Sequence, residues 1–234
     1  VWIGLVTLVS GGYGLGTLLL VNNYTGAPSL SGGRWHYWFL EALVQLLIVL
    51  TALFAIPAVR RLERRDGFLF VLGLLGGALA VRFDLLGIGQ EQNHIFRTHT
   101  VAWLFLLGWA IQRAPTPGHR LAVTGLVAAC VPGFFGEPVR EAVIMGGLAL
   151  LIWVPVVVVP GRFSRPIALV AAASLHIYLT HWQVWPALAA VLPVELVLPL
   201  TIAVGIAAWM VVERGTAVAV RASGLRPRLP SRRR

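Results

Sequence analysis

Charge, cysteine and lysine are all scarce in this chain. Charged residues make up 12% of its 234 residues, Cys130 is the single cysteine, and all nineteen basic residues are arginine. One cysteine excludes a disulfide framework or a cysteine metal site within the chain. The low charge, combined with 58% hydrophobic residues and a mean hydropathy of +0.81, excludes an ordinary soluble globular protein.

The apolar residues are gathered into long runs, and the charged residues lie between them. A hydrocarbon core of about 30 Å needs roughly 20 apolar residues per helix. The runs show no strand-like alternation, so helices are expected rather than strands. We therefore expect an all-α, polytopic transmembrane helical bundle of about eight spans. The expected spans are 1–22, 36–57, 67–86, 98–113, 120–137, 142–160, 165–190 and 195–213.

The arginines are distributed unevenly about these runs. If residue 1 starts in the cytoplasm, fifteen arginines lie on the inner side and four on the outer side. The positive-inside rule then predicts that both termini are cytoplasmic. The net charge of +10 does not indicate nucleic acid binding, because the arginines mark loop ends rather than one soluble face. Residues 214–234 are expected to form a basic, disordered cytoplasmic tail that attracts anionic membrane lipids.

The run 171–185 carries more polar side chains than a lipid-facing helix tolerates. Ser174, Tyr178, His181 and Trp185 follow a helical spacing of i, i+4, i+7 and i+11, which places them on one stripe. Such a helix usually faces a protein interior or a wet cavity. His181 is either part of a reactive site or a histidine satisfied by a neighbouring helix. A second polar row lies beside this stripe and consists of His176, Thr180 and Gln183.

Further candidate residues lie toward the outer side. Glu41, with Gln45 one turn deeper on the same face, lies inside the second expected span. A carboxylate at that depth should be paired, protonated or exposed to a cavity, although an interhelical hydrogen bond without chemistry would also explain it. Trp38 lies near a membrane interface, where an aromatic belt is the alternative to a substrate platform. The remaining candidates for substrate binding on this side are His36, His94 and Arg97.

Three of these segments resemble the integral-membrane acyltransferase-3 family. Residues 34–57 are similar to its aromatic–Trp–x–Leu pattern, followed by a Gln and a long span ending in Pro. Residues 173–185 are similar to its late helix with Ser, Tyr-Leu and His, and 100–113 to its Phe/Leu-rich span ending in Gly-Trp. The matching residues are Trp38, Leu40, Gln45, Pro57, Ser174, Tyr178, Leu179 and His181.

The resemblance implies an O-acyltransferase of the bacterial cytoplasmic membrane, with residues 1–213 as its transmembrane domain. Such an enzyme transfers an acyl group, commonly acetyl, from the co-substrate acyl-coenzyme A to a hydroxyl of a glycan, a lipid-linked acceptor or a glycosylated metabolite. No bound cofactor or metal is expected. A base must take the alcohol proton and a donor must stabilise the oxyanion. His181 and Tyr178 are the candidate catalytic residues. In the family the base would be an N-terminal His, with His181 as a supporting residue and Tyr178 as a hydroxyl donor. If the chain stands alone, His181 is the one well-placed candidate for the base. Ser174 is a candidate for substrate binding.

The chain also departs from the family pattern. Family members begin with a helix that bears an Arg and, about ten residues later, a His, whereas this sequence has neither before Arg34. A Glu of the family's second-span pattern is replaced by Leu43. We therefore expect a fragment that lacks the family's N-terminal third, with a literally translated GTG start codon as the alternative. A transporter or flippase-like protein and a non-catalytic membrane subunit remain alternative functions.

Overall fold

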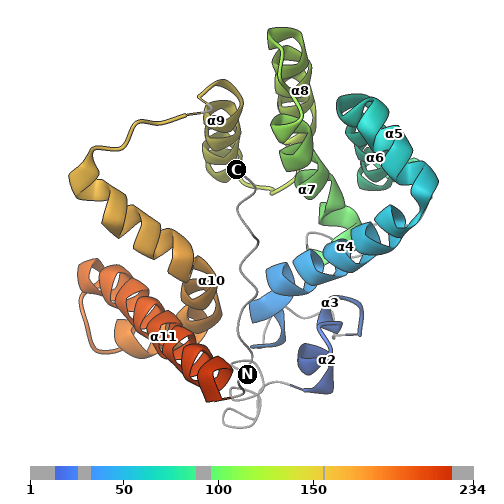
Figure 1. Cartoon of the computed structure of the whole chain (residues 1–234). Helices are drawn as coiled ribbons and strands as arrows, with labels where there is room; N and C mark the ends of the chain where they lie inside the picture. Colours follow the sequence, from blue (N-terminus) through green and yellow to red (C-terminus); the bar gives the residue numbers. More distant parts are fainter. Residues whose placement is uncertain (1–13, 26–32, 88–95, 155, 223–234) are drawn as a thin grey trace, which may run out of the picture. The chain divides into compact units, whose positions relative to one another are not determined.

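The computed structural model describes residues 14–25, 33–87, 96–154 and 156–222. All regular elements within these ranges are helices (Figure 1). The chain divides into two compact units, Val1–Val157 and Val158–Arg234. The all-helical class expected from the sequence is therefore confirmed for the described residues.

The first unit is built mainly from helices whose starts are marked in the sequence. Pro57, Pro117 and Pro138 stand at the beginning of three of them, where a missing N–H costs nothing. The Asp66 carboxylate accepts a hydrogen bond from the Leu69 N–H at 3.0 Å and so caps a fourth. The elements of this unit are α2 (Leu15–Leu18), α3 (Asn22–Thr25), the 3-10 helix η1 (Gly33–Tyr37), α4 (Trp38–Ala55), α5 (Pro57–Arg65), α6 (Gly67–Arg82), α7 (Thr98–Gln112), α8 (Pro117–Cys130) and α9 (Pro138–Trp153).

Three helical segments are long and apolar enough to cross a membrane: Trp35–Ala55, Gly161–Ala189 and Val194–Val220. Helix α6 is apolar but shorter. The expected spans from 36–57 to 195–213 each contain a helix, whereas most of 1–22 lies outside the described residues. These long apolar helices indicate association with a membrane.

Helix α7 lies at the centre of the first unit and contacts α4, α6 and α8. Its Trp103 and Leu107 are fully buried, together with Val71 and Leu75 of α6. Helices α4 and α7 run in the same direction, because the two helices meet at both ends. Trp38 at the start of α4 packs against Phe96 just before α7, with ring centroids 5.3 Å apart. Phe54 near the end of α4 packs against Trp109 near the end of α7 at 5.8 Å.

The second unit is a hairpin of two long helices, α10 (Gly161–Ala189) and α11 (Val194–Ala222) (Figure 1). Gly205 of α11 lies directly against the backbone of Ile177, since a Cβ added there would lie 2.5 Å from the Ile177 Cα. The sequence analysis ended the last span at residue 213 and expected a disordered tail from 214. The helix instead continues to Ala222. No proline follows residue 213 within it, and the single glycine there, Gly215, does not end the helix. Residues 223–234 of the expected tail lie outside the described residues.

Candidate functional site

A network of buried polar side chains joins α3, α4 and α7. Asn23, which is 1% exposed, is at its centre. Its backbone N–H donates to Oε2 of Glu41 at 3.0 Å, and its side-chain Nδ2 donates to Oγ1 of Thr98 at 2.7 Å. The same Nδ2 lies 3.3 Å from Oε1 of Gln45. One asparagine therefore links both candidate residues of α4 to the first turn of α7.

Gln45 completes this network with hydrogen bonds from both ends of its amide. Its Nε2 donates to the Leu20 carbonyl at 2.6 Å and to Oδ1 of Asn23 at 3.0 Å. Its Oε1 accepts a hydrogen bond from the Thr98 hydroxyl at 2.5 Å. Because donors and acceptors are matched in this way, the network fixes how the short helix α3 lies against α4 and α7.

The Glu41 carboxylate is the charged member of the network, and its side chain is fully buried. Its Oε1 has no hydrogen-bond partner among the residues that the structure describes, whereas Oε2 is held by Asn23. A buried carboxylate oxygen without a partner is costly, so such oxygens are rare and often mark a site of function. Glu41 is therefore the strongest candidate in the first unit for contacting a substrate or an ion.

Aromatic and basic side chains surround the network at the start of α4 and α7. The Arg97 guanidinium lies 5.9 Å from the centre of the Tyr24 ring, and the Tyr24 hydroxyl lies 3.2 Å from Nδ1 of His99. Trp38 packs against Phe96. Of the other candidates on this side, His36 is partly buried in η1, and His94 lies outside the described residues.

Several members of this site were missed by the sequence analysis. Asn23 was not singled out, and Thr98 was counted only as the first residue of the expected span 98–113. A signal was available, since Asn22 and Asn23 stand at the end of the first apolar run and Thr98 begins the fourth. The pairing of residues 23 and 98 is a long-range contact, however, and local patterns do not predict such contacts.

The second group of candidates lies on α10. Nδ1 of His181 lies 2.5 Å from the Tyr178 carbonyl oxygen. A carbonyl can only accept, so this bond places the proton on Nδ1 and leaves the lone pair on Nε2. The rings of Tyr178 and His181 lie 5.5 Å apart, centre to centre. The arrangement leaves His181 with a basic Nε2 beside a phenol, and this pair can take and donate protons.

The face that α10 presents to α11 is not the stripe of candidate residues. The fully buried residues on α10 are Ala173 and Thr180, and the Thr180 hydroxyl donates to the His176 carbonyl at 2.8 Å. Ser174 is exposed, whereas Tyr178 and His181 are partly buried. The small side chains meet α11, and the candidate stripe lies to one side of that contact.

A third polar cluster closes the turn between α8 and α9. The Glu141 carboxylate accepts hydrogen bonds from the N–H groups of Gly133 and Phe135, each at 2.9 Å, and of Gly136 at 3.2 Å. Gly133 and Gly136 have φ angles of +75° and +68°, which glycine adopts without strain. These N–H groups, that of Gly133 above all, hold the pKa of Glu141 below its ordinary value, and the charge of Arg82 adds to the effect.

Arg82 itself is buried at the end of α6 and contacts the same turn. Its Nη2 donates to the Cys130 carbonyl at 3.3 Å, and its guanidinium lies 4.6 Å from the centre of the Phe134 ring. It also lies 5.7 Å from the Trp103 ring. Arg82 of α6 therefore contacts both Trp103 of α7 and the turn whose N–H groups bind the Glu141 carboxylate. We interpret this cluster as stabilising the fold.

The two groups of candidate residues lie in different units of the chain. Glu41 and Gln45 belong to the first, and Tyr178 and His181 to the second. The fold and these residues define a helical, membrane-associated protein with polar side chains inside its long apolar helices. In comparisons with protein-family models, curated proteins and solved structures, no match to this chain was found.

Proposed function

We propose that this chain belongs to a membrane-embedded O-acyltransferase. It would transfer an acyl group, most simply acetyl, from acyl-coenzyme A to a hydroxyl of an extracytoplasmic or membrane-associated glycan or glycosylated metabolite. The proposal includes about eight spans, both termini in the cytoplasm and a bacterial cytoplasmic membrane. The resemblance of 34–57, 100–113 and 173–185 to the acyltransferase-3 family supports this activity.

The observation that carries the proposal is the carboxylate of Glu41, buried in a long apolar helix with one oxygen unpartnered among the described residues. A polar network inside a membrane helix is costly and is retained where a substrate or ion must be handled. The Asn23 and Gln45 amides use their donors within the network and hold Glu41 in place. Oε1 of Glu41 is then the atom of this network that could accept a hydrogen bond from a ligand hydroxyl group.

The roles of His181 and Tyr178 follow from the acyl transfer itself. Nε2 of His181 takes the proton of the acceptor hydroxyl while the oxygen of that hydroxyl attacks the thioester carbonyl carbon of acyl-coenzyme A. The Tyr178 hydroxyl donates to the oxyanion that forms, and the bond to sulfur then breaks. The coenzyme A thiolate leaves and takes up the proton. The Nδ1 bond to the Tyr178 carbonyl supports this assignment, because it selects the tautomer of the neutral ring in which Nε2 is the acceptor.

A variant at His181 tests the activity. His181→Gln, made in the protein expressed from its native locus, should lower transfer from radiolabelled acyl-coenzyme A in isolated membranes by about 10²–10⁴-fold, as expected for loss of a general base. His119→Gln in α8 is the matched control and should leave transfer unchanged. Equal membrane levels of the variants must be shown by immunoblot. Full transfer by His181→Gln would remove this residue from the reaction.

The same carboxylate favours a second candidate, which is a transporter or flippase-like protein. Carboxylates inside membrane helices line ion and substrate paths in such proteins. Under this alternative, Glu41→Gln abolishes uptake or flipping of a labelled glycolipid, while no acyl transfer is detected in wild-type membranes. Acyl transfer by the wild-type protein would decide against it.

A further inference from the structure

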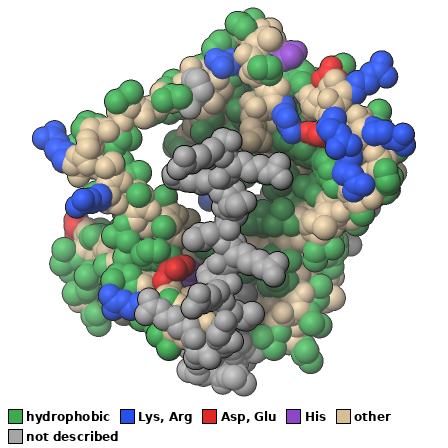
Figure 2. All heavy atoms as spheres, in the orientation of Figure 1, with side chains coloured by type: hydrophobic (Ala, Val, Ile, Leu, Met, Phe, Trp, Pro, Cys, Tyr) green, Lys and Arg blue, Asp and Glu red, His purple; other side chains and the backbone are tan. Residues whose placement is uncertain are grey.

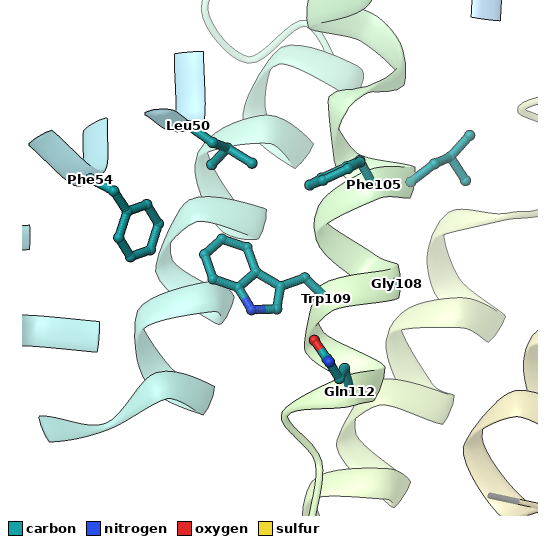
Figure 3. A pocket seen from close by; sticks show the side chains of 7 residues that line it. Leu50, Phe54, Phe105, Gly108, Trp109 and Gln112 are labelled. Atoms are coloured by element: carbon teal, nitrogen blue, oxygen red, sulfur yellow. The ribbon is translucent and has the colours of Figure 1, made fainter. Parts of the chain in front are cut away.

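An apolar groove lies between the C-terminal halves of α4 and α7 (Figure 3). Its volume is about 650 Å³. Figure 3 shows side chains from both helices around it, and Gln112 supplies the polar group at one end. We call this site the α4–α7 groove. Its labelled lining residues are Leu50, Phe54, Phe105, Gly108, Trp109 and Gln112.

The groove continues toward the other end of the two helices. A second apolar cavity of about 240 Å³ begins at Trp38 and Phe39. It shares Leu104 and Phe105 with the α4–α7 groove. Because α4 and α7 run in the same direction, the two cavities together follow both helices along most of their length. An extended hydrocarbon chain has the shape that such a surface accommodates.

The α4–α7 groove has the depth of a single lipid leaflet. From Leu104 to Gln112, α7 rises by about 12 Å at about 1.5 Å per residue. One leaflet contributes about 15 Å to a hydrocarbon core of about 30 Å. A lipid tail that enters beside Gln112 would therefore lie along the groove without leaving its own leaflet.

Arginine side chains gather at the end of the groove where Phe54 and Gln112 lie. Arg60 of α5 donates through Nη1 to the Phe54 carbonyl at 2.6 Å, which places the start of α5 beside this end. Arg113 follows Gln112 and pairs with Glu63 of α5. Figure 2 shows the arginines over α5 at the surface. The other exposed arginines of this helix are Arg61, Arg64 and Arg65.

We infer that the α4–α7 groove binds an anionic glycerophospholipid, with an acyl tail along α7 and the phosphate at the arginines of α5. The inference rests on the proposed topology, in which α5 lies at the cytoplasmic face. The apolar wall excludes a polar ligand, and the arginines select a negative headgroup over a zwitterionic one. The lipid then joins α4, α5 and α7.

Filling the groove tests the tail site. Gly108 lines the groove, and a Cβ added there would meet nothing within 4 Å, so Gly108→Leu extends a side chain into the groove. Gly147→Leu on α9 is the matched control, since Gly147 also has open space. Native mass spectrometry of the whole chain, released from micelles containing phosphatidylglycerol, should show retained lipid for wild type and Gly147→Leu. Gly108→Leu should lose it, and retention at the wild-type level would overturn the inference.

Changing the charge tests the headgroup site. The double variant Arg61→Gln with Arg64→Gln should lower the preference for phosphatidylglycerol over phosphatidylcholine of equal chain length by about five-fold for each arginine. Arg140→Gln, which removes one charge at another helix, should leave the preference unchanged. Equal retention of both lipids by wild type would overturn the anionic assignment. These measurements contain no acyl-coenzyme A, so their outcome is independent of whether His181→Gln abolishes transfer.

Discussion

Asn23 has an unusual number of polar contacts for a residue in so short a helix. Its backbone and side chain reach Glu41, Gln45 and Thr98, and of these three Glu41 and Thr98 are buried. A side chain that is committed to several partners holds each of them in one position. The geometry around Glu41 therefore depends on a residue outside α4.

Removing one hydroxyl from the network should have a measurable cost. Thr98→Val keeps the volume but removes the acceptor of Asn23 Nδ2 and the donor to Gln45 Oε1. We expect a loss of about 1–3 kcal/mol in stability, because buried partners are left unsatisfied. Thermal unfolding of the purified protein in detergent measures the change. Thr51→Val is the control, since its exposed hydroxyl bonds only within its own helix, and a similar loss in both variants would contradict the network.

Glu141 should make stability depend on pH in the acid range. Its folded-state pKa is lowered, chiefly by the Gly133 N–H, so its contribution is present above the ordinary value of 4.5. That contribution is lost as the pH falls through the lower folded value. Thermal unfolding from pH 6 to pH 3 should show this decline in wild type. Glu141→Gln should be less stable at pH 6 and should show a smaller decline, and parallel curves for both proteins would refute the assignment.

At the scale of single residues, part of the candidate functional site can be predicted from the sequence. Glu41 and His181 can be singled out from the sequence, because a carboxylate or an imidazole is costly inside an apolar run and often marks a functional site. The partners of Glu41 do not stand out, because Asn23 and Thr98 are ordinary residues at the ends of runs. Their roles arise from contacts between distant segments, and no local pattern encodes such contacts.

Helix α5 shows what can be predicted for an element. The sequence analysis placed its residues in an inner loop, because charged residues ended the apolar run. Pro57 at the first helical position and the arginines, leucine and glutamate that follow it all favour a helix. A search for apolar runs does not detect α5, because this helix is short and rich in arginine. The limits of α4 and the start of α11 were predicted to within two residues, whereas α11 continues to Ala222 beyond the expected end at 213.

The close contact of α10 and α11 should be sensitive to one glycine. Gly205→Leu brings a side chain into the Ile177 backbone, where even a Cβ would lie 2.5 Å from the Cα. The helices must separate, and packing between small residues is a main source of helix association in membranes. We expect a clear drop in the unfolding temperature of the purified protein. Gly215→Leu on the same helix, where the space is open, should leave that temperature unchanged, and equal drops would contradict the tight contact.

At the scale of the whole molecule, the composition predicts the class of protein, a helical membrane protein, but not the number of membrane spans. Low charge and high hydropathy predict a helical membrane protein, and the all-helical fold with three long apolar helices agrees with that class. Helices such as α8 and α9 are shorter than a typical span. Their place in the bilayer depends on neighbouring helices and flanking residues as well as on hydropathy. The count of eight spans therefore needs a direct measurement.

The arginine distribution predicts which loops face the cytoplasm, and the single cysteine makes the prediction testable. Cys130 is buried, so wild type should not react with a membrane-impermeant thiol reagent on intact cells. In a Cys130→Ala background, Glu137→Cys at the start of α9 should be labelled, because this turn is expected outside. Pro115→Cys, beside Arg113 in the connection between α7 and α8, should be labelled only after the cells are opened. The opposite pattern would reverse the topology and place α5, with the proposed lipid headgroup, at the outer face.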